Sequence, residues 1–133
     1  KGRIDSLHLT DNISFIPDYS RQSRIDFLKS LSVITVPVRR PMAYGLFALE
    51  AMACSVPFVQ PATGVFSELA EYGGGVLYDP NNPVHLAETL RNVLSDTSRL
   101  KQLRTAARRT AETVFAIRKS AQDMAECFSR LER

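Results

Sequence analysis

Apolar residues recur along the chain in short blocks that predict strands alternating with helices. Four blocks are runs of three or four mostly apolar residues, each closed by Pro or Asp, which suit strands covered on both faces of a sheet. They lie at residues 13–16, 33–36, 58–60 and 76–78. Apolar residues three or four positions apart predict helices between and after these runs. The helices are expected at residues 21–31, 45–53, 65–72, from Pro83 onward, 99–114 and 117–131.

This alternation predicts an α/β fold of the Rossmann-like class, because strands joined through helices form a parallel sheet with helices on both faces. A doubly wound nucleotide-binding sheet usually has about six strands, whereas only four are visible in this sequence. We therefore expect about four or more strands in an incomplete domain whose first strand–helix units are missing. Residues 1–133 form this single partial domain, and Lys1 in place of an initiator Met agrees with a piece of a longer chain.

Bulk composition is that of a soluble globular domain, with 44% hydrophobic and 23% charged residues. No apolar run approaches the roughly 18 residues of a membrane span, and no signal peptide is visible. Cys54 and Cys127 are too few for a disulfide framework and lack metal-ligand spacing, so we expect free thiols in a reducing, cytoplasmic compartment. His8 and His85 are isolated and expected at the surface, and no metal is expected.

Charge is unevenly distributed along the chain. Residues 98–133 hold nine Lys or Arg against four Asp or Glu, a net charge of +5, whereas residues 1–97 hold eight against ten, a net charge of −2. The basic excess lies in the expected C-terminal helices, as a solvated helix surface or as a contact with anionic lipid or an acidic partner. A lipid contact would place the protein peripherally at the inner face of the membrane. Aromatic residues do not interleave the basic ones, so nucleic acid is not an expected partner.

The most informative segment joins the strand at 33–36 to the helix at 45–53. Such a helix begins at the carboxyl edge of the sheet, where open α/β proteins bind ligands. Its first N–H groups, near Gly45, have no intrahelical partner and favour an anion such as a diphosphate. Glu50 lies in an otherwise apolar helix, and a carboxylate buried there needs partners. Two ribose hydroxyls would supply such partners for Glu50, but so would the backbone or an Arg. Gly45 taken alone suits packing or helix entry better than ligand contact.

Several segments together resemble the retaining GT-B glycosyltransferases of family 4. Their C-terminal domain carries the pattern Glu-x-Phe-Gly-x-x-x-x-Glu-Ala-Met-Ala, followed by Gly-x-Pro-Val-Val. The corresponding segments here are Met-Ala-Tyr-Gly-Leu-Phe-Ala-Leu-Glu-Ala-Met-Ala at 42–53 and Ser-Val-Pro-Phe-Val at 55–59. Further similar segments are Gly-Val-Phe-Ser-Glu-Leu at 64–69, Gly-Gly-Val-Leu-Tyr-Asp-Pro at 74–80 and Leu-Ala at 86–87. The resemblance covers roughly residues 11–115.

This resemblance implies the donor-binding C-terminal domain of an enzyme that moves a sugar from a nucleotide-diphosphate-sugar to a glycan, lipid or small-molecule acceptor. The amides of Gly45 and Leu46 would hold the donor phosphates, Glu50 would bind the ribose diol, and Tyr19 would lie beside the base. Neither a metal nor another cofactor is implied. The acceptor-binding N-terminal domain, and the Arg and Lys that neutralise the diphosphate, are expected outside this chain. No catalytic residue is therefore assigned here, and the piece is expected to be inactive alone.

Two departures from the family pattern bear on activity. Met42 stands where the first glutamate of the pair typically bonds donor-sugar hydroxyls, and a thioether cannot replace that carboxylate. Either the sugar is recognised differently, or the chain comes from a non-catalytic homologue that binds a nucleotide or a partner. Ser55 replaces a usual Gly at a turn. Arg39 and Arg40 are close enough in sequence to suggest a diphosphate contact, but loop arginines are more often solvated or paired with acids.

An unrelated doubly wound domain, such as a receiver or a sugar-phosphate isomerase module, is the remaining alternative. It would place an acidic cluster or a catalytic Cys or His near the strand ends, and the sequence shows neither. A Gly-x-Ser-x-Gly segment and a Ser-His-Asp set are absent as well.

Overall fold

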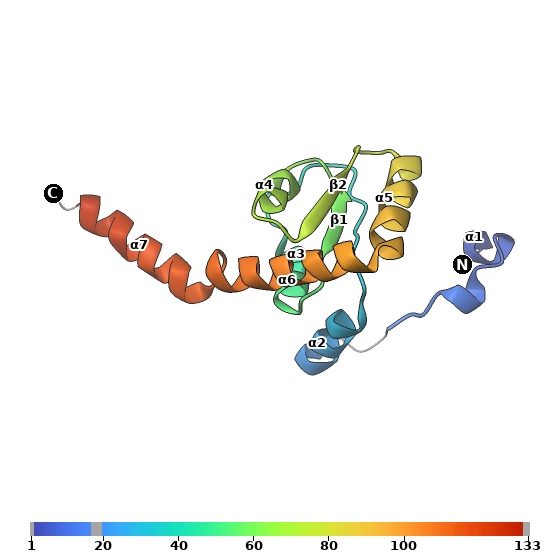
Figure 1. Ribbon diagram of the computed structural model, residues 1–133, viewed down its shortest axis with the longest axis horizontal. Coiled ribbons are helices and arrows are strands. Elements are labelled where there is room, and N and C mark those ends of the chain that lie inside the picture. Colours follow the sequence, from blue (N-terminus) through green and yellow to red (C-terminus); the bar gives the residue numbers. More distant parts are fainter. Residues whose placement is uncertain (1, 17–19, 132–133) are drawn as a thin grey trace.

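Helices pack around a small parallel sheet in this α/β fold (Figure 1). The computed structural model describes residues 2–16 and 20–131. The elements within them are α1 (Gly2–Ser6), the 3-10 helix η1 (Thr10–Asn12), α2 (Arg21–Ser30), α3 (Leu46–Ala53), β1 (Phe58–Pro61), α4 (Val65–Glu71), β2 (Gly75–Tyr78), α5 (Pro83–Ser95), α6 (Thr97–Thr113) and α7 (Ile117–Leu131). Every helix predicted from the apolar spacing is present, whereas α1 and η1 have no counterpart among the predicted elements.

The sheet contains two strands within the described residues. β1 and β2 are parallel, with Phe58 opposite Gly75 and Pro61 opposite Tyr78. The α/β class with parallel strands is therefore confirmed, but the prediction of about four strands is wrong for this part of the chain. The segments at 33–36 and 13–16 are the two that differ, and each has its own physical reason.

Residues 33–36 run beside β1 but form a single parallel bridge, between Ile34 and Phe58. The N–H of Ile34 donates to the carbonyl of Pro57 at 3.0 Å, and the N–H of Val59 donates to the carbonyl of Ile34 at 2.9 Å. The segment thus starts the backbone ladder of a strand on the side of β1 away from β2.

A proline ends this backbone ladder after one step. In the same register the N–H of residue 61 would donate to the carbonyl of Val36, but Pro61 has no N–H. The side-chain amide of Gln60 takes its place when it is oriented so that both of its polar atoms are satisfied. Its nitrogen then donates to Val36 O at 2.8 Å and its oxygen accepts from Val36 N–H at 2.9 Å. Gln60 is fully buried. The segment therefore runs parallel to β1 like a strand, but its second set of hydrogen bonds is made by the Gln60 side chain instead of by the backbone of β1.

Residues 13–16 form no strand, because none of the described residues pairs with them. A strand needs neighbouring strands or a packed face to be stable. Phe15 is 74% exposed as a result. Three residues of the segment instead line a cleft beside α2 and α3: Ser14, Phe15 and Ile16.

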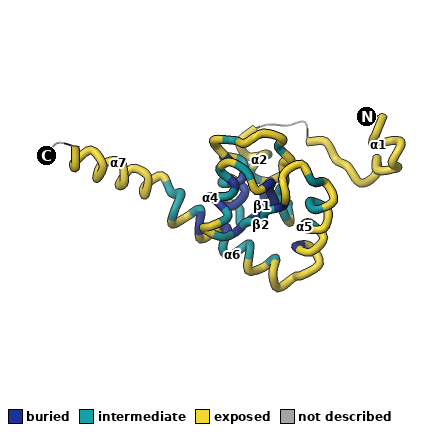
Figure 2. Tube along the Cα trace, turned by 90° about the horizontal axis from the view of Figure 1, so that it is seen from above, coloured by how far each residue is buried: buried dark blue, intermediate teal, exposed yellow. Residues whose placement is uncertain are grey.

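Buried residues gather around the two strands (Figure 2). Successive residues of β1 point to opposite sides of the sheet, because side chains alternate along a strand. On one side Phe58 packs with residues of α3, α4 and α6. These residues are Ala48, Met52, Phe66, Leu69 and Ala107. On the other side Val59 packs with Tyr78 and with Val93 of α5. Gly75 passes directly under the Phe58 ring, where an added Cβ would lie 2.0 Å from a ring carbon. Both faces of the sheet are therefore covered.

α6 binds the C-terminal ends of two other helices. Arg104 Nη2 donates to the carbonyl of Leu31, the C-cap of α2, at 2.7 Å. Arg108 donates to the carbonyl of Ala53, the last residue of α3. Cations are favoured at these positions because the last carbonyls of a helix carry a partial negative charge. Part of the basic excess therefore has a structural role that neither interpretation of the sequence included.

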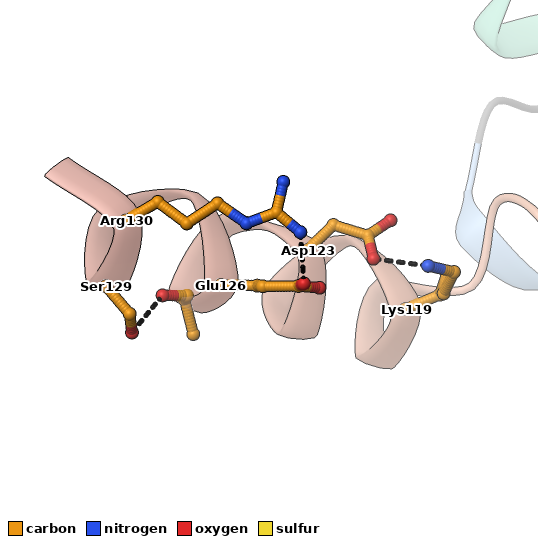
Figure 3. Close-up of polar contacts among 6 residues, drawn as sticks. Lys119, Asp123, Glu126, Ser129 and Arg130 are labelled. Atoms are coloured by element: carbon orange, nitrogen blue, oxygen red, sulfur yellow. Dashed lines mark hydrogen bonds and ion pairs between the residues drawn. The ribbon is translucent and has the colours of Figure 1, made fainter.

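α7 has no buried residue and extends away from the rest of the fold (Figure 1). Its charged side chains pair along the helix, Lys119 with Asp123 and Arg130 with Glu126 (Figure 3). Such pairs stabilise an exposed helix by about 0.2–0.5 kcal/mol each. The opposite side of the helix carries an exposed apolar stripe: Ile117, Met124, Phe128 and Leu131.

Candidate functional site

The site is built around the first turn of α3. The helix begins at Leu46, and Gly45 is its N-cap residue, whose carbonyl accepts from the N–H groups of Ala48 at 2.9 Å and Leu49 at 3.1 Å. No side chain caps this end. Among the described residues, the amides of Gly45, Leu46 and Phe47 donate to no backbone carbonyl. These amides therefore have no backbone partner there, and the helix dipole favours a negatively charged acceptor at this end.

Gly45 itself is buried against α4. A Cβ at this position would lie 3.2 Å from side-chain carbons of Leu69 and Phe66 and 3.3 Å from one of Val65. Its φ of −112° is available to any residue, so the backbone conformation does not require glycine here. The close approach of α3 to α4 does favour it, which agrees with the packing and helix-entry role expected for Gly45 taken alone.

Glu50 faces away from the core. The buried side of α3 consists of Ala48, Ala51 and Met52, whereas the Glu50 side chain is 43% exposed. The expectation of a carboxylate buried within an apolar helix is therefore wrong, because the small residues of α3 pack inward and turn Glu50 outward. Arg24 Nη2, from α2, lies 3.3 Å from Glu50 Oε1. An Arg partner is one of the alternatives that the sequence left open.

Glu50 and Arg24 line a cleft of about 580 Å³ between residues 14–16, α2 and α3. The other lining residues are mostly apolar: Ser14, Phe15, Ile16, Phe27, Leu28, Ile34 and Phe47. Apolar walls with a few polar groups are typical of small-molecule sites. This cleft would accept a flat, apolar group with hydrogen-bonding atoms directed at the ion pair.

The sequence reasoning missed Phe15, Phe27 and Arg24 as cleft residues. Phe27 and Arg24 are three positions apart on α2, a spacing that places them on one helix side, but which side faces α3 is decided only by packing. Tyr19, predicted to lie beside a nucleotide base, falls outside the described residues.

Met42 belongs to the loop before α3 and is held by main-chain contacts. Its carbonyl accepts from the N–H of Val65 at 3.1 Å. Gly64 has a φ of +56°, and a Cβ there would lie 2.6 Å from Met42 O, so two separate constraints favour glycine. The half-buried Met42 side chain packs against the apolar cluster around Phe66. The position at which the pattern that the sequence resembles has a glutamate is thus occupied by an apolar side chain that packs against the core.

Arg39 does not join the Glu50 cleft. It lines a different cleft, of about 480 Å³, together with Tyr78, Asn82 and Leu86. Arg39 and Arg40 are exposed and make no ion pair among the described residues. The structure therefore does not place either arginine beside the amides and carboxylate of α3.

Other site chemistries have little support in the part of the chain that the structure describes. There, no three His, Cys, Asp or Glu side chains come together as metal ligands, and Cys54 and Cys127 are free thiols. None of the helices within 2–16 and 20–131 has the length and apolar character needed to cross a bilayer. Burial raises the pKa of the Tyr78 hydroxyl above its ordinary value of 10.0, which makes Tyr78 a neutral packing residue.

Parallel strands flanked by helices, with a helix that begins beside a carboxylate and an apolar cleft, place the chain in the Rossmann-like α/β class. Comparison with known proteins gives its family. The profile described as "Glycosyl transferases group 1" matches residues 1–110. The chain belongs to this family.

A curated relative from Salinispora arenicola, D-inositol 3-phosphate glycosyltransferase, is 34% identical over 107 residues, covering 80% of this chain and 24% of that protein. The chain thus spans about a quarter of the length of the curated relatives it matches.

Solved structures share the fold. Anabaena HepE, solved in complex with UDP and glucose, has a TM-score of 0.85 at 23% identity, covering 97% of this chain and 35% of that one. The C-terminal domain of a glycosyl transferase group 1 family protein from Francisella tularensis has a TM-score of 0.72 at 21% identity, covering 87% and 60%. The fold is that of a GT-B glycosyltransferase C-terminal domain, as the sequence resemblance implied.

Proposed function

We propose that this chain carries part of the donor site of a retaining glycosyltransferase, and that it binds the nucleotide-diphosphate portion of a nucleotide-sugar. The observation that carries the proposal is the arrangement of α3, whose first amides are unpaired and whose Glu50 opens onto an apolar cleft. Leu46 and Glu50 are four residues apart, so they lie on one side of the helix. At 1.5 Å per residue they are separated by about 6 Å along the axis, a spacing compatible with a phosphate and the ribose attached to it.

In this proposal each part of the donor meets a matching part of the site. The diphosphate sits at the amides of Gly45 and Leu46, where fixed dipoles stabilise the charge of the leaving group without a metal. The ribose hydroxyls donate to the Glu50 carboxylate, and the base enters the cleft beside Phe15 and Phe27. Anabaena HepE, which shares the fold and was solved in complex with UDP and glucose, supports a nucleotide-sugar donor.

The complete enzyme needs more than this chain. The acceptor, a glycan, lipid or small molecule, would be bound by a further domain, since the chain spans about a quarter of its curated relatives. Polysaccharide biosynthesis is the process we infer, in the cytoplasm, where free thiols such as Cys54 and Cys127 persist. The piece alone would bind donor weakly and transfer nothing.

The test is a titration of the full-length protein with UDP, GDP and ADP, comparing the parent with Glu50→Ala. Removing the carboxylate should weaken binding of the preferred nucleotide about tenfold or more, because a hydrogen bond to a charged group contributes about 1.5–3 kcal/mol. Glu88→Ala, which removes an exposed carboxylate from α5, is the matched control and should leave the affinity unchanged. Unchanged affinity in Glu50→Ala would show that the ribose assignment is wrong.

A non-catalytic homologue that binds a nucleotide or a partner is the second candidate function. Met42 favours it, because an apolar side chain packed against the core replaces the carboxylate that reads the donor sugar in the family. Sugar transfer by the full-length parent would exclude this candidate. If the parent is inactive, a gain of transfer in Met42→Glu, absent from Met42→Leu, would show that this single replacement silenced the site.

A peripheral membrane contact is a further part of the proposal. Apart from Arg104, which binds the carbonyl of Leu31, four basic residues of α6 and α7 make no ion pair within the described stretches: Arg99, Lys101, Arg109 and Arg118. Each Lys or Arg near an anionic surface contributes about 1 kcal/mol, and salt screens the attraction. Binding of the full-length protein to anionic liposomes should therefore fall as ionic strength rises. Binding that ignores salt would contradict an electrostatic contact.

A further inference from the structure

Arg24 is the charged neighbour of Glu50 in the apolar cleft. The two side chains come from different helices, Arg24 from α2 and Glu50 from α3, and meet at 3.3 Å. Both line the cleft of about 580 Å³, and its remaining walls are mostly apolar. We propose that Arg24 is a positioning residue, which holds the Glu50 carboxylate in the orientation that distinguishes a ribonucleotide from a 2′-deoxynucleotide. This inference rests on the proposed function of the site.

The stability of the fold does not account for this ion pair. The side chains of Arg24 and Glu50 are 55% and 43% exposed, and pairs this exposed contribute little to folding. The Glu50 side chain is long and half-exposed, so without a partner it samples several rotamers. The ion pair with Arg24 restricts it, which lowers the conformational cost that a ligand meets when it binds.

The carboxylate can bind both the arginine and a ligand. Arg24 Nη2 contacts Oε1 of Glu50, and an ionised carboxylate has about four acceptor positions. Two ribose hydroxyls can therefore donate to Glu50 while Arg24 stays in place. Arg24 acts on the ligand through Glu50, so its effect should depend on the hydroxyls that Glu50 reads.

The experiment measures ribose discrimination in the full-length protein. Dissociation constants for UDP, GDP and ADP, and for their 2′-deoxy counterparts, are determined by calorimetry for the parent, Arg24→Gln, Glu50→Gln and the double variant. We expect the parent to prefer the ribonucleotide by about fivefold or more, the value of one hydrogen bond. Arg24→Gln should reduce this preference about threefold, and the double variant should discriminate no less than Glu50→Gln alone.

Three further variants and measurements separate positioning from a general structural role. Arg24→Lys should restore part of the preference, because a lysine retains the donor and the charge. Arg21→Gln, which removes a like charge from the same helix outside the cleft lining, should leave the preference intact. Urea midpoints should agree for all variants, whereas a structural loss would weaken ribo- and deoxynucleotides equally.

The outcomes that overturn this inference differ from those that overturn the proposed function. If the parent binds no nucleoside diphosphate, or binds ribo- and deoxynucleotides equally, both the Glu50 assignment and the role of Arg24 are wrong. If Glu50→Gln loses the preference but Arg24→Gln keeps it in full, the donor site stands and the role of Arg24 is wrong.

Discussion

Replacing Gln60 with Leu tests whether a side chain supports the strand path at 33–36. The Gln60 amide makes two hydrogen bonds with the backbone of Val36, at 2.8 and 2.9 Å, and it is fully buried. Leu has a similar size but can neither donate nor accept. Gln60→Leu would therefore leave the N–H and the carbonyl of Val36 facing an apolar side chain.

The expected loss follows from those two backbone groups. Leaving a buried donor or acceptor unsatisfied costs about 1–3 kcal/mol, and the added apolar surface of Leu offsets part of this. Val36 is 40% exposed, so water can reach part of its backbone, and we expect the free energy of unfolding to fall by about 1–3 kcal/mol. For a chain of this length that loss corresponds to a fall in Tm of roughly 10 °C.

Urea unfolding of the chain, followed by far-UV circular dichroism, measures this loss as a shift of the midpoint at constant slope. Gln102→Leu is the matched control, since Gln102 lies exposed on α6 and should change stability by less than about 0.5 kcal/mol. Gln60→Asn, which keeps an amide on a shorter side chain, should also be destabilised. A Gln60→Leu variant as stable as the parent would refute the idea that the Gln60 amide replaces the missing backbone hydrogen bonds to Val36.

Three other predictions concern packing and charge. Burial raises the pKa of Tyr78 above 10.0, so as pH rises the Tyr78 hydroxyl deprotonates in the unfolded chain before it does so in the folded one. The free energy of unfolding should therefore fall as pH rises beyond 10.0, and it should fall less in Tyr78→Phe. Gly75→Ala should cost about 1–3 kcal/mol, since its Cβ would overlap the Phe58 ring, and Phe58→Leu in the same chain should recover part of that loss in urea unfolding. Arg104→Gln should lower the free energy of unfolding by about 1 kcal/mol or more, through the lost hydrogen bond to Leu31, while Arg99→Gln should not.

The sequence predicted the helices well because their determinants are local. Pro83 starts α5, and the Asn82 side chain caps it by accepting from the N–H of His85 at 3.0 Å. Apolar residues at helical spacing gave the remaining helices from α2 onward. These signals operate within one or two turns, so no knowledge of the rest of the fold is needed.

The errors at residues 33–36 and at Glu50 depend on distant parts of the chain. The ladder at 33–36 is interrupted by Pro61, 25 or more residues later in the sequence. The exposure of Glu50 was mispredicted because α3 is apolar all round, so its pattern does not show which side faces the core. The pairing of Arg24 with Glu50 likewise depends on how α2 packs against α3. Contacts of this kind are set by tertiary packing, which a periodic pattern does not contain.

The two arginines of α6 have a mechanical consequence for the cleft. Arg24 lies on α2 and Glu50 on α3, and the two side chains meet across the cleft. α6 is hydrogen-bonded to the C-terminal ends of both helices, through Arg104 to α2 and through Arg108 to α3. If α2 moved relative to α3, at least one of these two hydrogen bonds would have to break. The width of the cleft is therefore limited by contacts outside it, so a substitution on α6, away from the cleft lining, is expected to change that width.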